Sequence, residues 1–206
     1  MMVENHNTKI INKKHTMNNF EKYINTNKQL WNNKVYHHIA SDFYKMDNFL
    51  AGNTSLNTIE LDLLGNIEGK SVLHLQCHFG QDSISLAKLG AKVTAIDFSE
   101  IAIEKAKKLA AKHQVSVNFQ CNDWEGFDWR ANHYDTIAGI FFQFADPESR
   151  TELFEKLNHA LKPGGTLIIQ GYGKAQMQYN TGGPGILENL YDEELLLNSF
   201  KGYKVI

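Results

Sequence analysis

Short apolar segments alternate with helical patterns between residues 71 and 170 of this chain. The segments with the length of β-strands are Ser71–Leu75, Lys92–Ile96, Val115–Gln120, Thr136–Phe142 and Thr166–Gln170. Strands that alternate with helices pair in parallel through right-handed crossovers, and the helices then cover both faces of the sheet. We therefore expect an α/β fold with a doubly wound, mostly parallel sheet, in which Ser71–Leu75 lies between Lys92–Ile96 and Thr136–Phe142.

Capping residues set the expected ends of the helices. Ser99 precedes one helical pattern, and Asp146 followed by Pro147 opens another. A serine or aspartate side chain at this position accepts a backbone N–H of the first turn, and proline fits the first helical position. By the same reasoning we expect Ser55 to cap a helix that closes at Gly65.

The chain before the first strand has two parts. Residues 1–26 are rich in Asn and Lys and have almost no periodic apolar residues, so we expect a disordered tail. Apolar and aromatic residues then recur at helical spacing; they are Leu30, Trp31, Val35, Tyr36, Ile39, Phe43 and Tyr44. Residues 27–65 are expected to form the helical layer of a single domain, 27–206. We expect this layer to act as a lid on the carboxyl edge of the sheet, packed against Ile140–Phe144, although a simple cover on the outer sheet face is the alternative.

Charge and composition exclude several classes of partner. The 206 residues include 21 Lys or Arg and 23 Asp or Glu, which leaves a formal charge of −2. Such a chain has no positive field to attract nucleic acid or an anionic membrane, so we expect neither as a partner. The N-terminus lacks the apolar segment of a signal peptide, and no stretch has the length of a membrane span. These features favour a cytoplasmic protein. The two cysteines indicate no disulfide framework, and no His or Cys spacing predicts a metal site.

Ligands of a doubly wound sheet bind outside the carboxyl ends of its strands, so the residues that follow each strand are informative. Gln76, His78 and Gly80 follow the first strand, and glycine lets a backbone turn tightly and approach a ligand. Asp97 and Phe98 follow the second strand. One carboxylate at this place accepts hydrogen bonds from both hydroxyls of a ribose, so we expect a ribose-bearing ligand. An ordinary turn and a helix-capping aspartate are the alternatives.

The exits of the third and fourth strands extend this site. Asp123 and Trp124 follow the third strand, and the Asp123 carboxylate is able to accept a hydrogen bond from an exocyclic adenine amine. A polar loop is the alternative interpretation. The run Ile140–Phe144 follows the fourth strand and is too apolar for a phosphate site. It suits the wall of a pocket around an adenine or a sulfonium.

Three motifs together resemble class I S-adenosylmethionine-dependent methyltransferases. They are Val72–Gly80, Val93–Asp97 and Leu161–Gly165, and the Leu-Lys-Pro-Gly-Gly turn is the most specific. The resemblance covers roughly residues 55–206 and implies a Rossmann-like fold, with S-adenosylmethionine as the cofactor. Within this family, Ile140–Phe144 and the segment from Tyr172 to Pro184 are most similar to tellurite-resistance-type methyltransferases, which implies a small-molecule acceptor.

The resemblance also implies roles for single residues. The implied cofactor-binding residues are Gln76, His78, Gly80, Asp97, Phe98, Asp123, Trp124 and Ile140. The loop at Gly80 would hold the methionine part, Asp97 the ribose, and Asp123 with Trp124 the adenine. The chain departs from the family at His74, where an acidic residue is usual, and at Gln76 and His78, where glycines are usual. Another nearby residue would therefore have to bind the amino group of the cofactor.

The C-terminal end is a further departure. A fold of this class normally ends with two antiparallel strands after the helix expected near Asp192–Phe200, and Tyr203–Ile206 has room for one. We expect either a chain truncated after Ile206 or a sheet that ends in another way.

The acceptor side is less specific. Its candidate residues, chosen by their expected place at the mouth of the sheet, are Tyr36, His37, Tyr44, Gln143 and Tyr172. None stands out as a general base, which suits a soft nucleophile such as a thiol or a metalloid anion. The expected function is methyl transfer from S-adenosylmethionine to a small-molecule acceptor by in-line displacement. A non-catalytic S-adenosylmethionine-binding or sensor protein is the alternative. A nicotinamide-dependent dehydrogenase is disfavoured because the G-x-G-x-x-G motif is missing.

Overall fold

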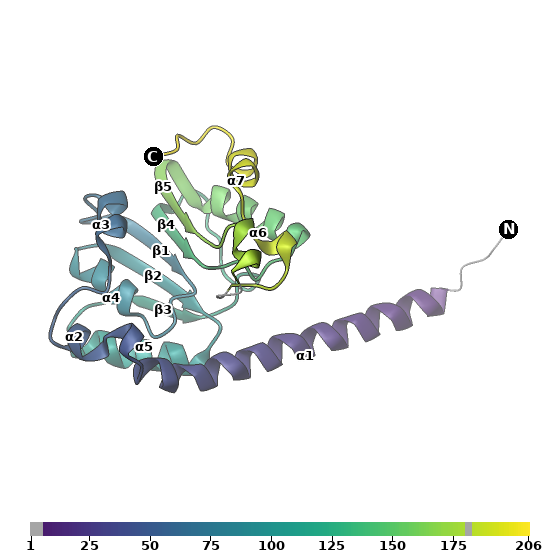
Figure 1. The fold of residues 1–206 in the computed structure, drawn as a ribbon, viewed down its shortest axis with the longest axis horizontal. Coiled ribbons are helices and arrows are strands. Elements are labelled where there is room, and N and C mark those ends of the chain that lie inside the picture. The colour runs from purple at the N-terminus through teal and green to yellow at the C-terminus, as the bar shows by residue number, and fades with distance from the viewer. Residues whose placement is uncertain (1–5, 180–182) are drawn as a thin grey trace.

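The computed structural model describes the backbone of residues 6–179 and 183–206, and, within these ranges, the side chains of Lys22 and of residue 24 onward. Its elements, labelled as in Figure 1, are α1 (His6–Ile39), η1 (Asp42–Tyr44), α2 (Met46–Leu50), α3 (Thr58–Leu64), β1 (Ser71–Leu75), α4 (Gln81–Lys88), β2 (Lys92–Asp97), α5 (Glu100–Lys112), β3 (Asn118–Cys121), β4 (Tyr134–Ile140), α6 (Pro147–Ala160), β5 (Leu161–Gln170), η2 (Lys174–Gln178), η3 (Leu187–Asn189) and α7 (Glu193–Ser199).

Among the described residues, five strands form one sheet with the order β3-β2-β1-β4-β5. Every pairing is parallel, and Val72 of β1 is in register with Val93 on one side and Thr136 on the other. Strand β1 is therefore central, which confirms the predicted Rossmann-like, doubly wound sheet. Because the strands are parallel, their carboxyl ends meet at one edge, where ligands of such folds bind.

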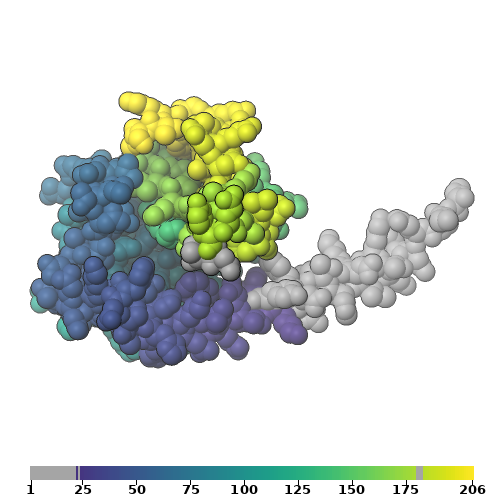
Figure 2. Space-filling view, viewed as in Figure 1, coloured from purple at the N-terminus to yellow at the C-terminus, as the bar shows by residue number. Residues whose placement is uncertain are grey.

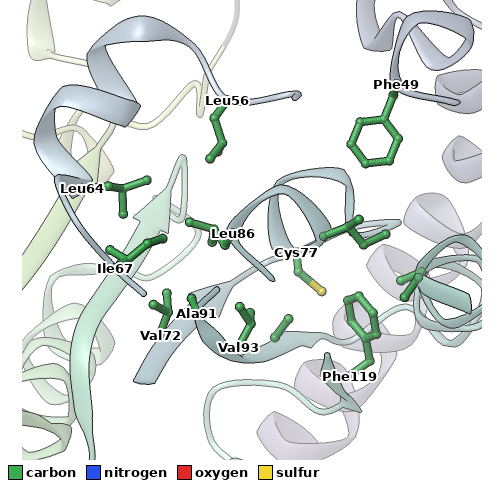
Figure 3. Packing of buried hydrophobic residues seen from close by; sticks show 14 of the residues in the cluster. Phe49, Leu56, Leu64, Ile67, Val72, Cys77, Leu86, Ala91, Val93 and Phe119 are labelled. Carbon is green, nitrogen blue, oxygen red and sulfur yellow. The ribbon is translucent and has the colours of Figure 1, made fainter. Parts of the chain in front are cut away.

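One face of the sheet is filled by the side chains drawn in Figure 3. Val72 and Val93 enter this cluster from the sheet, and Leu86 enters it from α4. Phe49 of α2 and Leu64 of α3 belong to the same cluster and are 2% and 9% exposed. The helices before β1 are thus part of the core, and burial of each such side chain stabilises the fold by roughly 1.5–3 kcal/mol.

The opposite face packs against α6. Leu73 and Leu75 of β1 and Ile137 of β4 contribute to a second buried cluster that includes Leu153 and Leu157 of α6. Successive residues of a strand point to opposite faces, so Val72 and Leu73 enter different clusters. Both faces of the sheet are covered, as the alternation of strands and helices predicted.

The long helix α1 projects from the rest of the molecule at its N-terminal end (Figure 1). It includes residues 6–26, where the sequence indicated a disordered tail, and residues 1–5 lie outside the described residues. The C-terminal part of α1 packs on the domain through Val35, which is fully buried with Phe79 and Ala102. The described apolar partners of the C-terminal part of α1 are therefore Phe79 and α5, and those of α2 and α3 belong to the sheet and α4, whereas the sequence analysis named Ile140–Phe144.

Two of the predicted helix caps are present. The side chains of Ser99 and Asp146 accept backbone N–H groups of the first turns of α5 and α6, at 3.1 and 2.8 Å. Pro147 is the first residue of α6, as expected. These caps satisfy donors that a helix leaves unpaired at its N-terminus.

The predicted cap of α3 was wrong. Asn57 caps this helix, and its side chain and that of Glu60 each accept the other residue's backbone N–H in a capping box. The hydroxyl of Ser55 lies instead 3.0 Å from the hydroxyl of Ser85 in α4. Ser55 therefore fastens the connection before α3 to the next helix of the domain.

Strand limits also differ from those predicted. Strand β3 begins at Asn118 rather than Val115, because the Val115 N–H donates to the carbonyl of Ala110 at the end of α5. Strand β4 ends at Ile140 rather than Phe142, because Phe141 has a left-handed φ of 54° that an extended strand cannot continue through. Strand β5 begins at Leu161 and includes the Pro-Gly-Gly turn.

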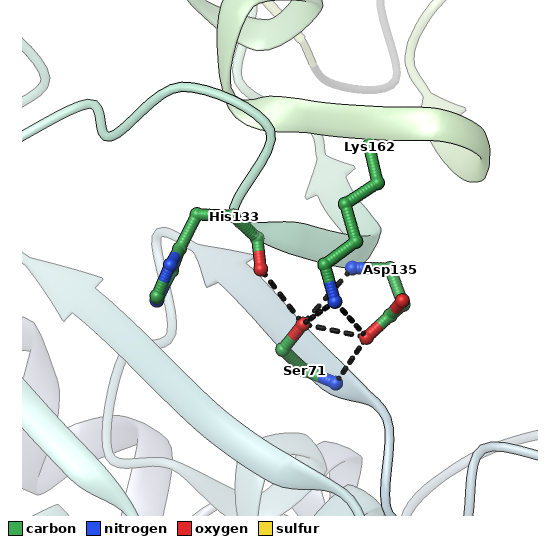
Figure 4. A network of polar contacts seen from close by, with 4 residues as sticks. All are labelled: Ser71, His133, Asp135 and Lys162. Carbon is green, nitrogen blue, oxygen red and sulfur yellow. Dashed lines mark hydrogen bonds and ion pairs between the residues drawn. The ribbon is translucent and has the colours of Figure 1, made fainter.

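A polar network ties the beginnings of three strands together (Figure 4). The Ser71 hydroxyl of β1 donates to the Asp135 carboxylate of β4 at 2.6 Å, and its oxygen lies 2.9 Å from the carbonyl oxygen of His133. Lys162 of β5 lies 2.8 Å from the same carboxylate. These hydrogen bonds hold the pKa of Asp135 well below its usual range. The network lies at the amino edge of the sheet, opposite the candidate site.

The C-terminal helix begins after Asp192, close to the predicted start, and Asp192 caps it. Residues 203–206 form no strand; the Tyr203 hydroxyl donates to the Asn158 side chain at 2.8 Å, and Ile206 is 77% exposed. Within the described residues, no helix combines the length and the apolar character that a membrane span needs.

Candidate active site

The loop after β1 has an unusual backbone. Gln76 and His78 adopt left-handed conformations with φ values of 52° and 50°, and Gly80 follows with a φ of 80°. Residues other than glycine rarely adopt this conformation, because their Cβ atom approaches the backbone too closely. Gln76 and His78 are the two positions where the resembling family has glycines. The loop thus keeps a shape natural to glycine with larger side chains on it.

Gly80 is required by close packing. A Cβ atom at this position would lie 2.8 Å from the Phe119 ring and 2.9 Å from the Cβ of Ala106. Gly80 is also the N-cap of α4, and its carbonyl accepts the Ile84 N–H at 2.9 Å. The loop therefore lies directly against β3 and α5, with the N-terminus of α4 at the carboxyl edge of the sheet.

Asp97 lies at the end of β2 and bonds to this loop. One oxygen of its carboxylate accepts the His78 N–H at 2.8 Å, and the other accepts the Ser99 N–H at 2.9 Å. Burial raises the pKa of Asp97, although both backbone hydrogen bonds oppose the shift. A carboxylate oxygen accepts more than one hydrogen bond, so both oxygens keep capacity for ligand hydroxyls.

The departure at His74 has a structural explanation. This side chain is buried within β1, and its Nδ1 lies 2.8 Å from the Ser83 hydroxyl of α4. Burial lowers the pKa of His74, and the neighbouring charge of Asp82 opposes that shift. Asp82 is half-buried in the first turn of α4. The family has its acidic residue at the position of His74 in β1. In this chain, Asp82 is an acidic residue close to that position.

The side chain of His78 points to the N-terminal layer. Its Nε2 lies 2.8 Å from Nδ1 of His38 in α1. The Tyr44 ring stacks on His38 with centroids 5.0 Å apart, and Trp31 meets both imidazoles edge-on. Burial, followed by the charge of His38, lowers the pKa of His78 to about 4. Helix α1 and η1 therefore enclose one side of the loop.

Three acceptor candidates of the N-terminal layer have different surroundings. Tyr44 lies in the cluster just described, and burial raises the pKa of its hydroxyl. Tyr36 is 56% exposed, with Lys105 of α5 over its ring, and His37 is exposed. His38, which the sequence analysis did not select, lies beside the loop instead of His37.

The residues expected around an adenine lie at the exits of β2, β3 and β4. Phe98 is half-buried, and the exposed Asp123 accepts the backbone N–H of Gly126 at 2.7 Å. Trp124 is half-buried against the α6 side of the core, where Lys156 lies over its ring. Ile140 is half-buried at the end of β4. Their role toward a cofactor stays a prediction.

Gln143 and Tyr172 belong to the exits of β4 and β5. The buried Gln143 side chain donates to the Tyr172 carbonyl at 2.8 Å and accepts the Tyr172 N–H. Its amide therefore holds the backbone after β5. The half-buried Tyr172 ring lies 4.7 Å from that of Phe141, which is 46% exposed. An aromatic surface follows these two strands.

A groove of about 540 Å³ lies elsewhere, between α6 and α7. Its lining includes Phe154, Asn158, Lys174, Asp192 and Leu195. None of the predicted cofactor or acceptor residues lines it. The site defined by the strand exits is therefore a different place on the molecule.

The spacing of the residues in α1 could have indicated that His38 points toward the domain. Trp31, Val35 and His38 are separated by four and three residues, so they share one face of a helix. Val35 is fully buried, which fixes this face toward the domain. Tyr36 and His37 follow on other faces of the same turn.

Comparison with known proteins fits this arrangement. Residues 72–165 match the family described as a methyltransferase domain. A ubiquinone biosynthesis O-methyltransferase of Coxiella burnetii is 36% identical over 105 residues, which are 50% of this chain and 44% of that protein. The chain thus spans less than half the length of this curated relative.

Solved structures agree on the fold. A structure described as "Conversion of a Disulfide Bond into a Thioacetal Group during Echinomycin Biosynthesis" has a TM-score of 0.56 and 23% identity, covering 70% of this chain and 65% of that one. TehB from Haemophilus influenzae has a TM-score of 0.52 and 22% identity, covering 61% and 44%. At these identities the likeness shows the fold alone.

The sheet order and the family match define the class of the domain. Residues 72–165 form a methyltransferase domain of the class I S-adenosylmethionine-dependent type, which confirms the predicted class. S-adenosylmethionine is the cofactor of this class.

Proposed function

We propose that this chain transfers the methyl group of S-adenosylmethionine to a small-molecule acceptor at the carboxyl edge of the sheet. The observation that carries the proposal is Asp97 at the end of β2, bonded to the left-handed loop after β1 through the His78 N–H. Its oxygens retain acceptor capacity for ribose hydroxyls. When bound, S-adenosylmethionine supplies a methyl group already activated by a sulfonium.

The proposed cofactor residues bind different parts of S-adenosylmethionine, according to their positions at the carboxyl edge of the sheet. Asp97 accepts the ribose hydroxyls, while Gln76, His78 and Gly80 shape the backbone toward the methionine part. Asp82, half-buried at the start of α4, is the proposed partner of the cofactor's amino group. The negative charge of Asp82 would pair with the positively charged amino group, a role that the His74 side chain does not provide.

The proposed adenine side is formed by the next strand exits. Phe98 and Ile140 offer half-buried apolar surface, and the exposed carboxylate of Asp123 is available to an exocyclic amine. The half-buried Trp124 supports this loop from the α6 side. Together these residues would hold the base between the exits of β2 and β4.

The proposed acceptor side lies between the aromatic exits of β4 and β5 and the N-terminal layer. Phe141 and Tyr172 provide aromatic rings on the side of the sheet. In this proposal Tyr44, which contacts His78, lies on the other side of the acceptor and belongs to the N-terminal layer. Burial raises the pKa of Tyr44, so its hydroxyl stays protonated and orients rather than accepts a proton. A soft nucleophile such as a thiol or a metalloid anion needs no protein base.

Product formation tests the proposal. The full chain is incubated with S-adenosylmethionine and small thiols, metalloid oxyanions or phenols, and S-adenosylhomocysteine is quantified. We expect release of S-adenosylhomocysteine that depends on one class of acceptor. Binding of the cofactor without turnover on any acceptor would favour the alternative, a non-catalytic S-adenosylmethionine-binding or sensor protein.

A further inference from the structure

His38 and His78 form a contact between segments distant in sequence. Nδ1 of His38 and Nε2 of His78 lie 2.8 Å apart, and the rings are nearly perpendicular at 88°. One imidazole must donate its N–H and the other must accept, because a single proton fits between the two nitrogens. The hydrogen bond joins α1 directly to the loop after β1.

Aromatic rings surround this hydrogen bond. Tyr44 stacks on His38, and its ring also meets His78 edge-on at 5.7 Å. Trp31 contacts both imidazoles at 6.1 and 6.0 Å. Phe79 closes the cluster at 4.9 Å from Tyr44. A hydrogen bond partly shielded from water in this way is stronger than a fully exposed one.

The backbone of His78 connects the same residue to Asp97. Its N–H donates to the carboxylate at 2.8 Å, while its φ of 50° is one that a side-chain-bearing residue rarely adopts. Such a conformation persists when the surrounding contacts fix it. His78 is held by its side chain on α1 and by its N–H on Asp97.

We propose that His38 is a positioning residue for the cofactor site, which holds the His78 imidazole and thereby keeps the His78 N–H on Asp97. The inference rests on the proposed function, since the loop that it stabilises is the proposed cofactor loop. His38 is not among the proposed cofactor-binding residues. It acts through His78, and this makes the C-terminal part of α1 a component of the site.

The charges around the pair determine its response to pH. Burial, followed by the nearby charges of Lys34 and His37 on α1, lowers the pKa of His38. Asp82 of α4 acts on the neighbouring Tyr44, and Asp97 faces the backbone of His78. The first proton that the neutral pair takes up binds an outward-facing ring nitrogen and leaves the N–H···N bond intact, whereas protonation of both imidazoles breaks it. Binding is therefore expected to weaken only as the pH approaches the His78 pKa of about 4.

Two substitutions separate hydrogen bonding from packing. His38→Asn keeps a polar atom near the Nδ1 position, whereas His38→Leu keeps volume without a polar atom. We expect His38→Leu to weaken S-adenosylhomocysteine binding by about tenfold and His38→Asn by about threefold or less, as for loss and retention of one shielded hydrogen bond. Asn33→Leu, at an exposed position of α1, is the matched control and is expected to bind as the wild type does.

A double-mutant comparison isolates the pair. In a His78→Gly background, His38→Leu is expected to have no further effect on the dissociation constant, because the bonding partner is already absent. Equal losses in His38→Leu and His38→Asn, or wild-type affinity in His38→Leu, would overturn the positioning role.

Hydrogen exchange of the His78 amide gives a readout independent of the cofactor. His38→Leu is expected to speed this exchange more than it speeds the exchange of core amides, and His38→Asn is expected to restore protection. If the wild type fails to bind S-adenosylhomocysteine while this exchange pattern holds, the proposed function fails and the positioning role stands. Unchanged exchange in His38→Leu would contradict the positioning role itself.

Discussion

At the scale of single residues, the loop after β1 combines backbone strain with side chains that glycine lacks. Gln76 and His78 both have left-handed φ values, yet their side chains differ in use: His78 bonds to α1, while Gln76 is exposed. Contacts of the loop with Asp97 and α5 must therefore fix its shape, because the sequence no longer favours it locally.

Gln76 allows this strain to be measured. Gln76→Gly is expected to be about 1 kcal/mol more stable than Gln76→Ala, because only glycine adopts a φ of 52° without steric cost. In an ordinary helix or strand the order of the two variants is reversed. Urea unfolding of both variants measures the difference, and a more stable alanine variant would show that the loop is not strained at this position.

Asp97 carries the second prediction at this scale. Asp97→Ala is expected to weaken S-adenosylmethionine binding by about 2–4 kcal/mol, because hydrogen bonds to a charged acceptor are lost. Calorimetric titration measures the change. An affinity within about twofold of the wild type, a difference well below 1 kcal/mol, would mean that Asp97 serves only to fasten the loop and cap α5.

Residue types at strand exits could be predicted from the sequence, but contacts between distant segments could not. The sequence placed Asp97 and Gly80 at the same edge because parallel strands end together. It selected His37 rather than His38, since two adjacent histidines look alike until the buried face of the helix is known. Val35 fixes that face in the structure.

At the scale of elements, the amino ends of β1, β4 and β5 are fastened by one network. Ser71, Asp135 and Lys162 each come from a different strand, and the carboxylate accepts from both other side chains. The network keeps the central strands in register while the opposite edge remains available for a ligand.

Asp135→Asn tests this network through pH. Lys162 and Ser71 hold the pKa of Asp135 below its ordinary value of 3.8, so the unfolded chain binds a proton before the folded chain does as the pH falls. The carboxylate therefore stabilises the fold above that value, and the stabilisation is lost in acid. We expect Asp135→Asn to lose roughly 1–2 kcal/mol at neutral pH, with a smaller deficit below about pH 4.

Urea unfolding at both pH values measures this dependence. Asp128→Asn is the control, because Asp128 is 83% exposed and pairs with Arg130 at 3.6 Å. A deficit of the Asp135→Asn variant that stays constant with pH would contradict an ionised Asp135 as the centre of the network.

The start of a helix could be predicted from the sequence where only one nearby side chain was able to cap it. Ser99 and Asp146 are the last polar residues before clear helical patterns, and both cap their helices. Ser55 and Asn57 compete for one helix, and the choice depends on Ser85, which is distant in sequence. The start of β3 depends likewise on Ala110, which binds the Val115 N–H.

At the scale of the whole molecule, the N-terminal layer is both part of the core and a neighbour of the site. Val35 and Phe49 are almost completely buried. Lys28 pairs with Glu100 at the start of α5. The layer therefore cannot be removed as a detachable lid.

Two truncations test this arrangement. Deletion of residues 1–26 is expected to leave the melting temperature and cofactor affinity unchanged, since the described contacts between α1 and α5 begin at Lys28. Deletion through Phe49 is expected to unfold the domain, because it removes two core side chains, each contributing roughly 2–5 kcal/mol. Thermal unfolding of both proteins measures the outcome, and a folded longer deletion would show that the layer is dispensable for the core.

The sheet order and the layers of the molecule were predictable because strand–helix alternation allows few topologies. The path of α1 was not, because residues 6–26 lack an apolar pattern that would indicate what they pack against. Figure 2 shows the C-terminal part of α1 along the lower edge of the face that also carries the segment after β5.

Calorimetric titration of the full chain with S-adenosylhomocysteine tests the proposed cofactor site most directly. We expect saturable binding in the wild type and in Asp62→Asn, a charge-matched control at an exposed position of α3. Asp97→Asn is expected to weaken that binding by about tenfold or more, through loss of a charged acceptor. Equal affinities in the three proteins, or no binding by the folded wild type, would contradict a cofactor site at the carboxyl edge of the sheet.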